Sequence, residues 1–155
     1  MSIIKLSREE QIELLMLKQV QAERISKSKI DYCFPDKGER RRELYKKQVA
    51  FFKAGVTHKQ RLFMAANRVG KSFGMGCELT WHLTGRYPKW WEGKRFANAN
   101  EWWCCGVDSK AVKEVLQDLL IGRVGEFGQG LIPYECLDRD TMKEAQRMET
   151  PINSF

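Results

Sequence analysis

Apolar residues recur at helical spacing in the first third of the chain. Ser7, with Glu10 three positions later, forms a capping-box pattern that favours the start of a helix. After a polar stretch and a turn at residues 33–38, a second helix is predicted over roughly residues 39–53, and Gly55 follows where it should stop. The apolar positions that define the first helix are Ile12, Leu15, Met16 and Val20.

Two more helices are predicted downstream. A helical pattern follows residue 72 and runs to about residue 83, where Gly85 and Pro88 end it. Asp108 or Ser109 caps another helix, and Gly122 lies beyond its end. The apolar stripe of that last helix is made of Val112, Val115, Leu116, Leu119 and Leu120.

Short apolar runs at residues 61–66 and 101–107 predict two buried strands, each followed by one of these helices. The order strand, helix, strand, helix is typical of a parallel α/β sheet. We therefore expect an α/β fold with an incomplete parallel sheet, preceded by an N-terminal helical segment. Two strands alone leave open edges, so low solubility or a partner that completes the sheet is also expected.

Composition narrows the class of protein. The chain has 155 residues, the size of one domain, and 43% of them are hydrophobic, which is enough for a packed core. The net charge of +7 favours an anionic partner such as nucleotide or nucleic acid. No apolar run is long enough for a bilayer and no signal peptide is recognisable, so a cytoplasmic location is expected. Five cysteines without a CxxC pair indicate reduced, mostly buried thiols rather than a disulfide framework or a zinc site.

Residues 65–72 fit the phosphate-loop pattern G-x-x-x-x-G-K-[ST], with Ala65 in place of the first glycine. In such a loop Gly70 lets the backbone approach the phosphates, Lys71 reaches the β- and γ-phosphates, and Ser72 ligates Mg²⁺. The alternative is an ordinary connection between a strand and a helix. The predicted nucleotide-binding residues are Ala65, Ala66, Asn67, Arg68, Val69, Gly70, Lys71 and Ser72.

Arg68 lies inside this loop, beside the expected phosphates. It could act in cis on the γ-phosphate, as an arginine finger does, or it could be a solvated loop charge. With Lys71 it forms the predicted catalytic pair, and Ser72 is the predicted metal ligand.

The run Leu62–Ser72 resembles the variant phosphate loop of phage terminase large subunits, the motors that package viral DNA. The likeness continues through residues 82–93, 106–122 and 128–133, and covers roughly residues 40–137. It implies a P-loop NTPase fold of the RecA/ASCE type, with ATP and Mg²⁺ as cofactors. It also implies double-stranded viral DNA, a small terminase subunit and the capsid portal as partners, in the host cytoplasm of a phage or prophage.

The same resemblance implies a role for Gln48. Residues 45–48 resemble the family's adenine-recognition segment, in which a glutamine amide reads the adenine edge, with Phe51 or Phe52 nearby. The alternative is that Gln48 is merely the polar side of an amphipathic helix.

Two family features are missing from the sequence. No apolar strand ending in Asp-Glu follows Pro133, and no nuclease domain is present; Asp138, Asp140 and Glu144 are interpreted as a solvated tail. We therefore expect a truncated, frameshifted or split terminase product that binds ATP without efficient hydrolysis. Its expected segments are 1–55, helical with the adenine-recognition region, 56–137, a partial ATPase core, and 138–155, a charged tail.

The loop at residues 85–95 alternates aromatic and basic residues, which suits either base stacking or a structural cover; the structural interpretation is favoured. Trp102 and Trp103 are expected in the core, and His58 and His82 are isolated and give no catalytic constellation. Other classes remain open. They are a helicase-like P-loop ATPase, a small-molecule kinase, and a non-enzymatic adaptor for nucleic acid or portal.

Overall fold

The computed structural model describes residues 7–123 and 125–138, and every regular element within them is helical. In chain order these elements are α1 (Arg8–Lys27), η1 (Lys29–Tyr32), η2 (Arg42–Tyr45), α2 (Lys46–Ala54), α3 (Lys71–Thr84), α4 (Ser109–Ala111), η3 (Val112–Gln117), α5 (Asp118–Leu120) and η4 (Tyr134–Cys136). η3 is a π-helical stretch, so α4, η3 and α5 form one continuous helical segment. None of the helices described has the length and apolar character that a bilayer crossing requires.

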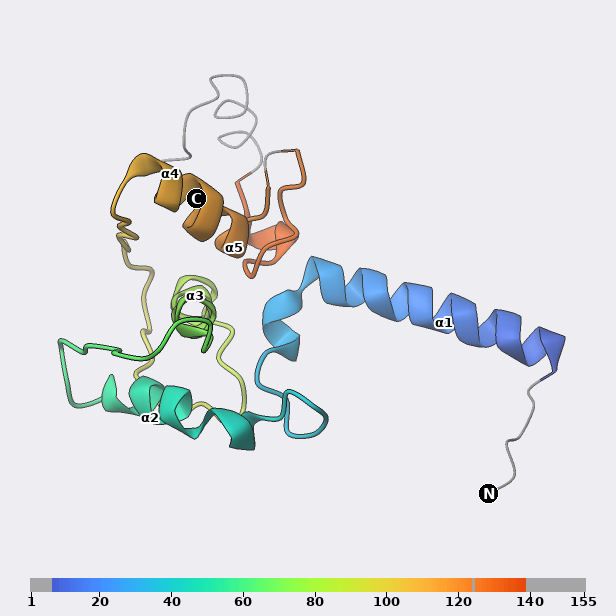
Figure 1. Cartoon of the computed structure of the whole chain (residues 1–155), viewed down its shortest axis with the longest axis horizontal. Helices are drawn as coiled ribbons and strands as arrows, with labels where there is room; N and C mark the ends of the chain where they lie inside the picture. Colours follow the sequence, from blue (N-terminus) through green and yellow to red (C-terminus); the bar gives the residue numbers. More distant parts are fainter. Residues whose placement is uncertain (1–6, 124, 139–155) are drawn as a thin grey trace.

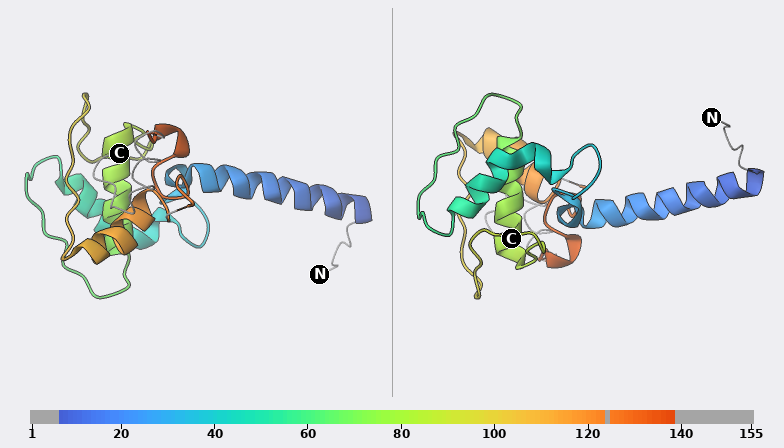
Figure 2. Two further views of the ribbon diagram at one scale, coloured as in Figure 1. Left: turned by 90° about the horizontal axis from the view of Figure 1, so that it is seen from above. Right: turned by 90° about the horizontal axis from the view of Figure 1, so that it is seen from below.

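The α3 helix lies at the centre of the molecule, with α2 on one side and the α4–α5 segment on the other (Figure 1). The loops at residues 85–108, 121–123 and 125–138 lie around these helices. α1 projects away from the body as a separate rod, and the views from above and from below both show this (Figure 2). α3 carries the predicted phosphate loop at its N-terminus, so the core helix also positions the candidate site.

The prediction of an α/β fold with a parallel sheet is wrong for the part of the chain that the structure describes, because no strand is found there. Residues 61–66 and 101–106 are irregular, and neither segment pairs with another in a ladder. Leu62 and Met64 are 81% and 80% exposed, so the first run is not a buried strand either. An apolar run becomes a strand only when neighbouring backbone supplies hydrogen bonds, and a run of residues alone cannot show whether that neighbour exists.

The predicted helix starts and stops are largely confirmed, unlike the predicted strands. Ser7 and Glu10 make the predicted capping box, with Ser7 accepting from the Glu10 N–H at 3.2 Å. Asp108 caps α4 by accepting from the Ala111 N–H at 2.7 Å. Gly85 ends α3 in the left-handed region, with φ of 68°. The second helix begins later than predicted, since residues 39–41 are not helical and η2 precedes α2.

An aromatic core holds α2, α3 and the aromatic–basic loop together. Trp81 of α3 is 1% exposed and contacts Phe52 of α2 and Trp91 of the loop, with ring centroids 5.7 and 4.9 Å apart. Trp91 itself is buried, which supports the structural interpretation of residues 85–95. The expectation that Trp103 is in the core is wrong, because its side chain is 89% exposed. A second apolar cluster joins α5 to the C-terminal loops through Leu120, Ile121, Ile132 and Leu137.

The thiols are less buried than expected. Cys77 alone is buried, whereas Cys105 and Cys136 are exposed and the other two are intermediate. The hydrogen bond with the Cys33 sulfur, together with burial, raises the pKa of the Cys77 thiol. The expectation of mostly buried thiols is therefore wrong, and Cys77 is held protonated within the core. Of the predicted charged tail, Asp138 is exposed and residues 139–155 lie outside the described part.

Candidate functional site

The predicted phosphate loop forms a tight turn directly before α3. Arg68 and Gly70 both have positive φ, at 61° and 79°, and Gly70 is the N-cap residue of α3. A left-handed conformation costs little at glycine and more at arginine, so the loop holds Arg68 in a strained conformation. Strain of this kind is found at ligand-binding turns.

The N-terminus of α3 is left without a side-chain cap. Gly70 has no side chain to accept from the first-turn N–H groups, and the first turn contains no acidic residue. Helix N-termini carry a partial positive charge and several unpaired N–H donors, which together suit an anion.

Lys71, the first residue of α3, folds back over the loop. Its ammonium Nζ donates to the carbonyl oxygens of Ala65 at 2.5 Å and Ala66 at 3.0 Å. The lysine therefore closes the loop as a ring of residues from 65 to 71. The remaining predicted residues, Ala65, Ala66, Asn67, Arg68, Val69 and Ser72, are exposed.

Gln48 of α2 supports this loop from below. Its side-chain Nε2 donates to the Val69 carbonyl at 3.1 Å and lies 3.5 Å from the Gly70 carbonyl. Gln48 is only 5% exposed, so it is not on the solvent face of its helix. A Cβ on Gly74 would come within 2.9 Å of Gln48 Oε1, so the glycine of α3 makes room for the amide. Among the described atoms that oxygen is buried without a hydrogen-bond partner.

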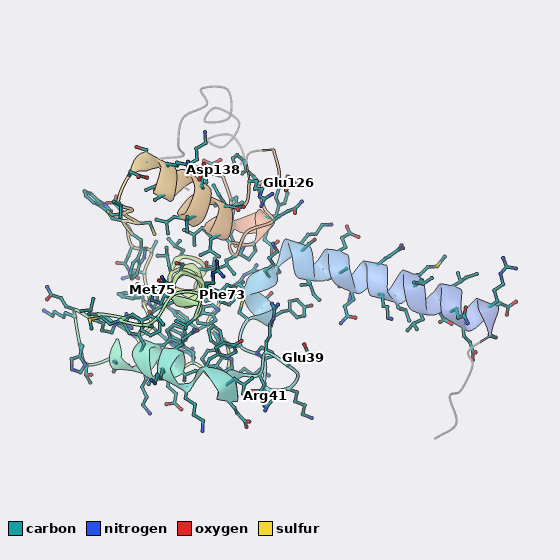
Figure 3. All side chains as sticks on the ribbon, in the orientation of Figure 1. Glu39, Arg41, Phe73, Met75, Glu126 and Asp138 are labelled. Atoms are coloured by element: carbon teal, nitrogen blue, oxygen red, sulfur yellow. The ribbon has the colours of Figure 1, made fainter. Side chains whose placement is uncertain are left out.

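The predicted site residues fall on two sides of the loop. Gln48, Arg68, Val69 and Gly70 line one cavity of about 600 Å³. Tyr45, Arg40 and Lys29 line the same cavity. Lys71 and Ser72 face a different cavity, of about 570 Å³, that lies between α3, the 101–105 segment and α5. Figure 3 shows Phe73 and Met75 on opposite sides of α3, and these two side chains line the first and the second cavity respectively. The loop therefore separates the two cavities, with Arg68 facing the first and Lys71 facing the second.

A charged cluster that was not predicted from the sequence lines the second cavity. Arg61 Nη2 lies 2.9 Å from Glu78 Oε1, and His82 Nε2 lies 3.6 Å from the same oxygen. His82 also bonds the Tyr87 hydroxyl through Nδ1 at 3.0 Å and stacks on Trp102. His82 is thus not isolated. The spacing of Glu78 and His82, four residues apart on a predicted helix, was the available signal.

Two acidic residues near Ser72 were also missed. Glu114 and Asp118, from η3 and α5, line a third cavity of about 560 Å³ together with Ser72. Asp118 lies 3.5 Å from Arg123. They were overlooked because both lie on an amphipathic helix rather than after an apolar strand. No group of three or more metal-ligating side chains is found among the described residues.

These features occur in a chain that is homologous to part of a phage terminase large subunit. The relative is the terminase large subunit of Salmonella phage P22, which is 38% identical to this chain over 145 residues. The match covers 84% of this chain and 27% of the relative, so the chain spans about a quarter of that protein's length. The resemblance expected from the loop and its flanking segments is confirmed. No protein-family profile matches the chain, and no solved structure matches it.

Proposed function

We propose that the loop at residues 65–72 binds the phosphates of a Mg²⁺–nucleoside triphosphate. The observation that carries this proposal is the turn with Arg68 and Gly70 at positive φ, placed directly before an uncapped helix N-terminus and closed by Lys71. The uncapped N–H groups of the first turn and the Lys71 ammonium lie at the same end of α3, and together they are the donor set that phosphate oxygens require. Ser72, exposed in the first turn of α3, supplies the hydroxyl for the metal.

Phosphate binding exchanges the partners of Lys71. Its ammonium is held by two neutral carbonyls, those of Ala65 and Ala66. Phosphate oxygens are charged acceptors and form stronger hydrogen bonds with an ammonium than carbonyls do. The same lysine therefore closes the loop and is the proposed cationic contact of the phosphates.

At the level of the whole machine, the chain is part of the ATP-driven motor that packages double-stranded viral DNA. This part of the proposal rests on the likeness to the P22 protein. The small terminase subunit and the capsid portal are its expected partners, ATP is the nucleotide, and Arg68 is the candidate arginine for the γ-phosphate.

The first test is direct titration of the full chain with a fluorescent ATP analogue, with and without Mg²⁺. We expect saturable binding that ATP displaces and that adenosine, which lacks phosphates, does not. Phosphate release measured in the same samples shows whether binding is accompanied by hydrolysis. Absence of saturable binding, or equal displacement by adenosine, would contradict the phosphate-loop assignment.

A second test separates two roles of Gln48. Its amide donates to the Val69 carbonyl in this structure, so reading an adenine edge would require it to turn away from the loop. We expect Gln48→Ala to weaken ATP and GTP alike, by roughly 5- to 10-fold, the worth of about one neutral hydrogen bond. Competition titrations with both nucleotides measure the ratio. A selective loss of ATP affinity would instead assign the amide to the adenine.

A further inference from the structure

The α1 helix is exposed along most of its length, and only Ile25 and Ser26 near its end are half-buried. None of its residues is buried, and it extends away from the body with its side chains in open space (Figure 3). Several of these side chains are large and apolar. Leu15, Met16 and Leu17 are 60%, 61% and 60% exposed, and Ile12, Leu14 and Val20 lie between 41% and 48%. Such a concentration of apolar side chains on one projecting helix marks an interaction surface.

Local interactions favour the α1 helix, but none of its residues is buried against the body, and such packing is what usually stabilises a helix. A capping box closes its first turn, and Lys27 pairs with Glu23 four residues earlier at 2.7 Å. Capping and a single exposed ion pair contribute modestly, and isolated helices of about this length are only marginally stable in water. A partner that covers the apolar side chains would supply what is missing.

Four of the apolar side chains, in the middle of the helix, share one broad face, whereas Leu14 and Leu17 lie on the opposite side. Ile12, Met16 and Val20 follow each other at intervals of four residues, and Leu15 lies beside them. Charged residues fill the two ends. This is the layout of a helix-packing seam with charged flanks.

The charges of the two ends are opposite. Residues 8–17 carry Arg8 against Glu9, Glu10 and Glu13, an excess of negative charge. Residues 18–27 carry Lys18, Arg24 and Lys27 against Glu23, an equal excess of positive charge. This polarity suits the dipole of a single helix, but the dipole does not account for the exposed apolar seam. An antiparallel copy of the same helix would satisfy both, because it places each acidic half against a basic half.

We propose that α1 is a self-association surface, which pairs antiparallel with α1 of a second copy of this chain. A parallel pair would cover the same apolar seam but set like-charged halves side by side. The antiparallel pair is isologous, so a two-fold axis crosses the seam near its centre. Because each helix is only about 30 Å long, the dimer is weak and its population depends on protein concentration.

Sedimentation velocity on the full chain over a concentration series tests the association. We expect a monomer–dimer equilibrium that Met16→Glu abolishes, since it places a charge in the seam. Gln21→Glu adds the same charge on the opposite side of the helix, beside Leu14 and Leu17, and should leave the dimer intact because that side does not belong to the seam. Both positions are exposed, so circular dichroism should show folded protein in each case. A monomer at every concentration, or a dimer that survives Met16→Glu, would overturn the proposal.

Orientation is tested by carbodiimide cross-linking of a mixture of ¹⁴N- and ¹⁵N-labelled chains. An antiparallel pair joins Glu9 or Glu10 of one copy to Lys27 of the other. These residues are about 26 Å apart along a single helix, too far for a zero-length link within one copy or between parallel copies. Mixed-isotope products joined through Glu23–Lys27, with no link from Glu9 or Glu10 to Lys27, would indicate parallel pairing and refute the antiparallel arrangement.

Discussion

Replacement of Lys71 by alanine is expected to lower the affinity for Mg²⁺–ATP by on the order of 10- to 100-fold. Hydrogen bonds to charged groups are worth about 1.5–3 kcal/mol, and each factor of ten in affinity corresponds to about 1.4 kcal/mol. The loss has two sources. The ammonium no longer meets the phosphates, and the carbonyls of Ala65 and Ala66 lose the donor that closes the loop.

The matched control is Lys113→Ala in η3, an exposed lysine outside the loop. It removes the same charge from the chain, so a general electrostatic attraction for nucleotide would weaken equally in both variants. We expect only Lys71→Ala to lose affinity in fluorescent-nucleotide titrations. Equal affinities for wild type and Lys71→Ala would mean that residues 65–72 are an ordinary turn before a helix.

Local signals in the sequence predicted the helices well because their causes are local. The capping box of Ser7 and Glu10, the Asp108 cap and the Gly85 stop each act within four residues. What these signals could not show is whether a helix has a neighbour. The stripe from Ile12 to Val20 suggests a buried face, yet α1 lies outside the core.

The strand predictions failed for the opposite reason, since a strand depends on partners far away in the sequence. Residues 61–66 have the composition of a buried strand, but their position is fixed by different contacts. Arg61 donates to the Phe51 carbonyl at 2.7 Å and Phe63 stacks on Phe51, which ties the segment to α2. Side-chain contacts of this kind leave no trace in hydrophobic periodicity.

The sequence predicted the position of the loop in the candidate site, but not the side chains that pack around the loop. The motif placed Gly70 and Lys71 at a helix N-terminus, where the structure has them. The burial of Gln48 beneath the loop follows from Gly74, whose missing side chain opens the space for the amide. No sequence motif predicts that Gly74 of α3 leaves space for the Gln48 side chain of α2.

The largest stability effect is expected from Glu78, which links α3 to the segment before the loop. Its carboxylate is 7% exposed and lies 2.9 Å from the Arg61 guanidinium, itself 22% exposed. Removal of one partner of a buried pair leaves the other charge uncompensated and costs about 3–5 kcal/mol. Because Arg61 keeps some contact with water, we expect Glu78→Leu to lower the free energy of unfolding by about 3 kcal/mol, near the lower end of that range. Urea denaturation followed by tryptophan fluorescence measures it.

Two further variants show whether the loss comes from the stranded arginine or from the missing carboxylate. The double variant Arg61→Leu/Glu78→Leu removes both charges, so it should recover part of the stability that Glu78→Leu loses. Glu92→Leu breaks the exposed pair with Lys53, whose partners are 63% and 65% exposed, and should change stability little. If the double variant is less stable than Glu78→Leu, the two side chains contribute independently and the pair does not hold residues 61–66 against α3. The position of the loop would then depend on the stacking of Phe63 on Phe51 and on the Gln48 amide, and Phe63→Ala would become the more damaging substitution.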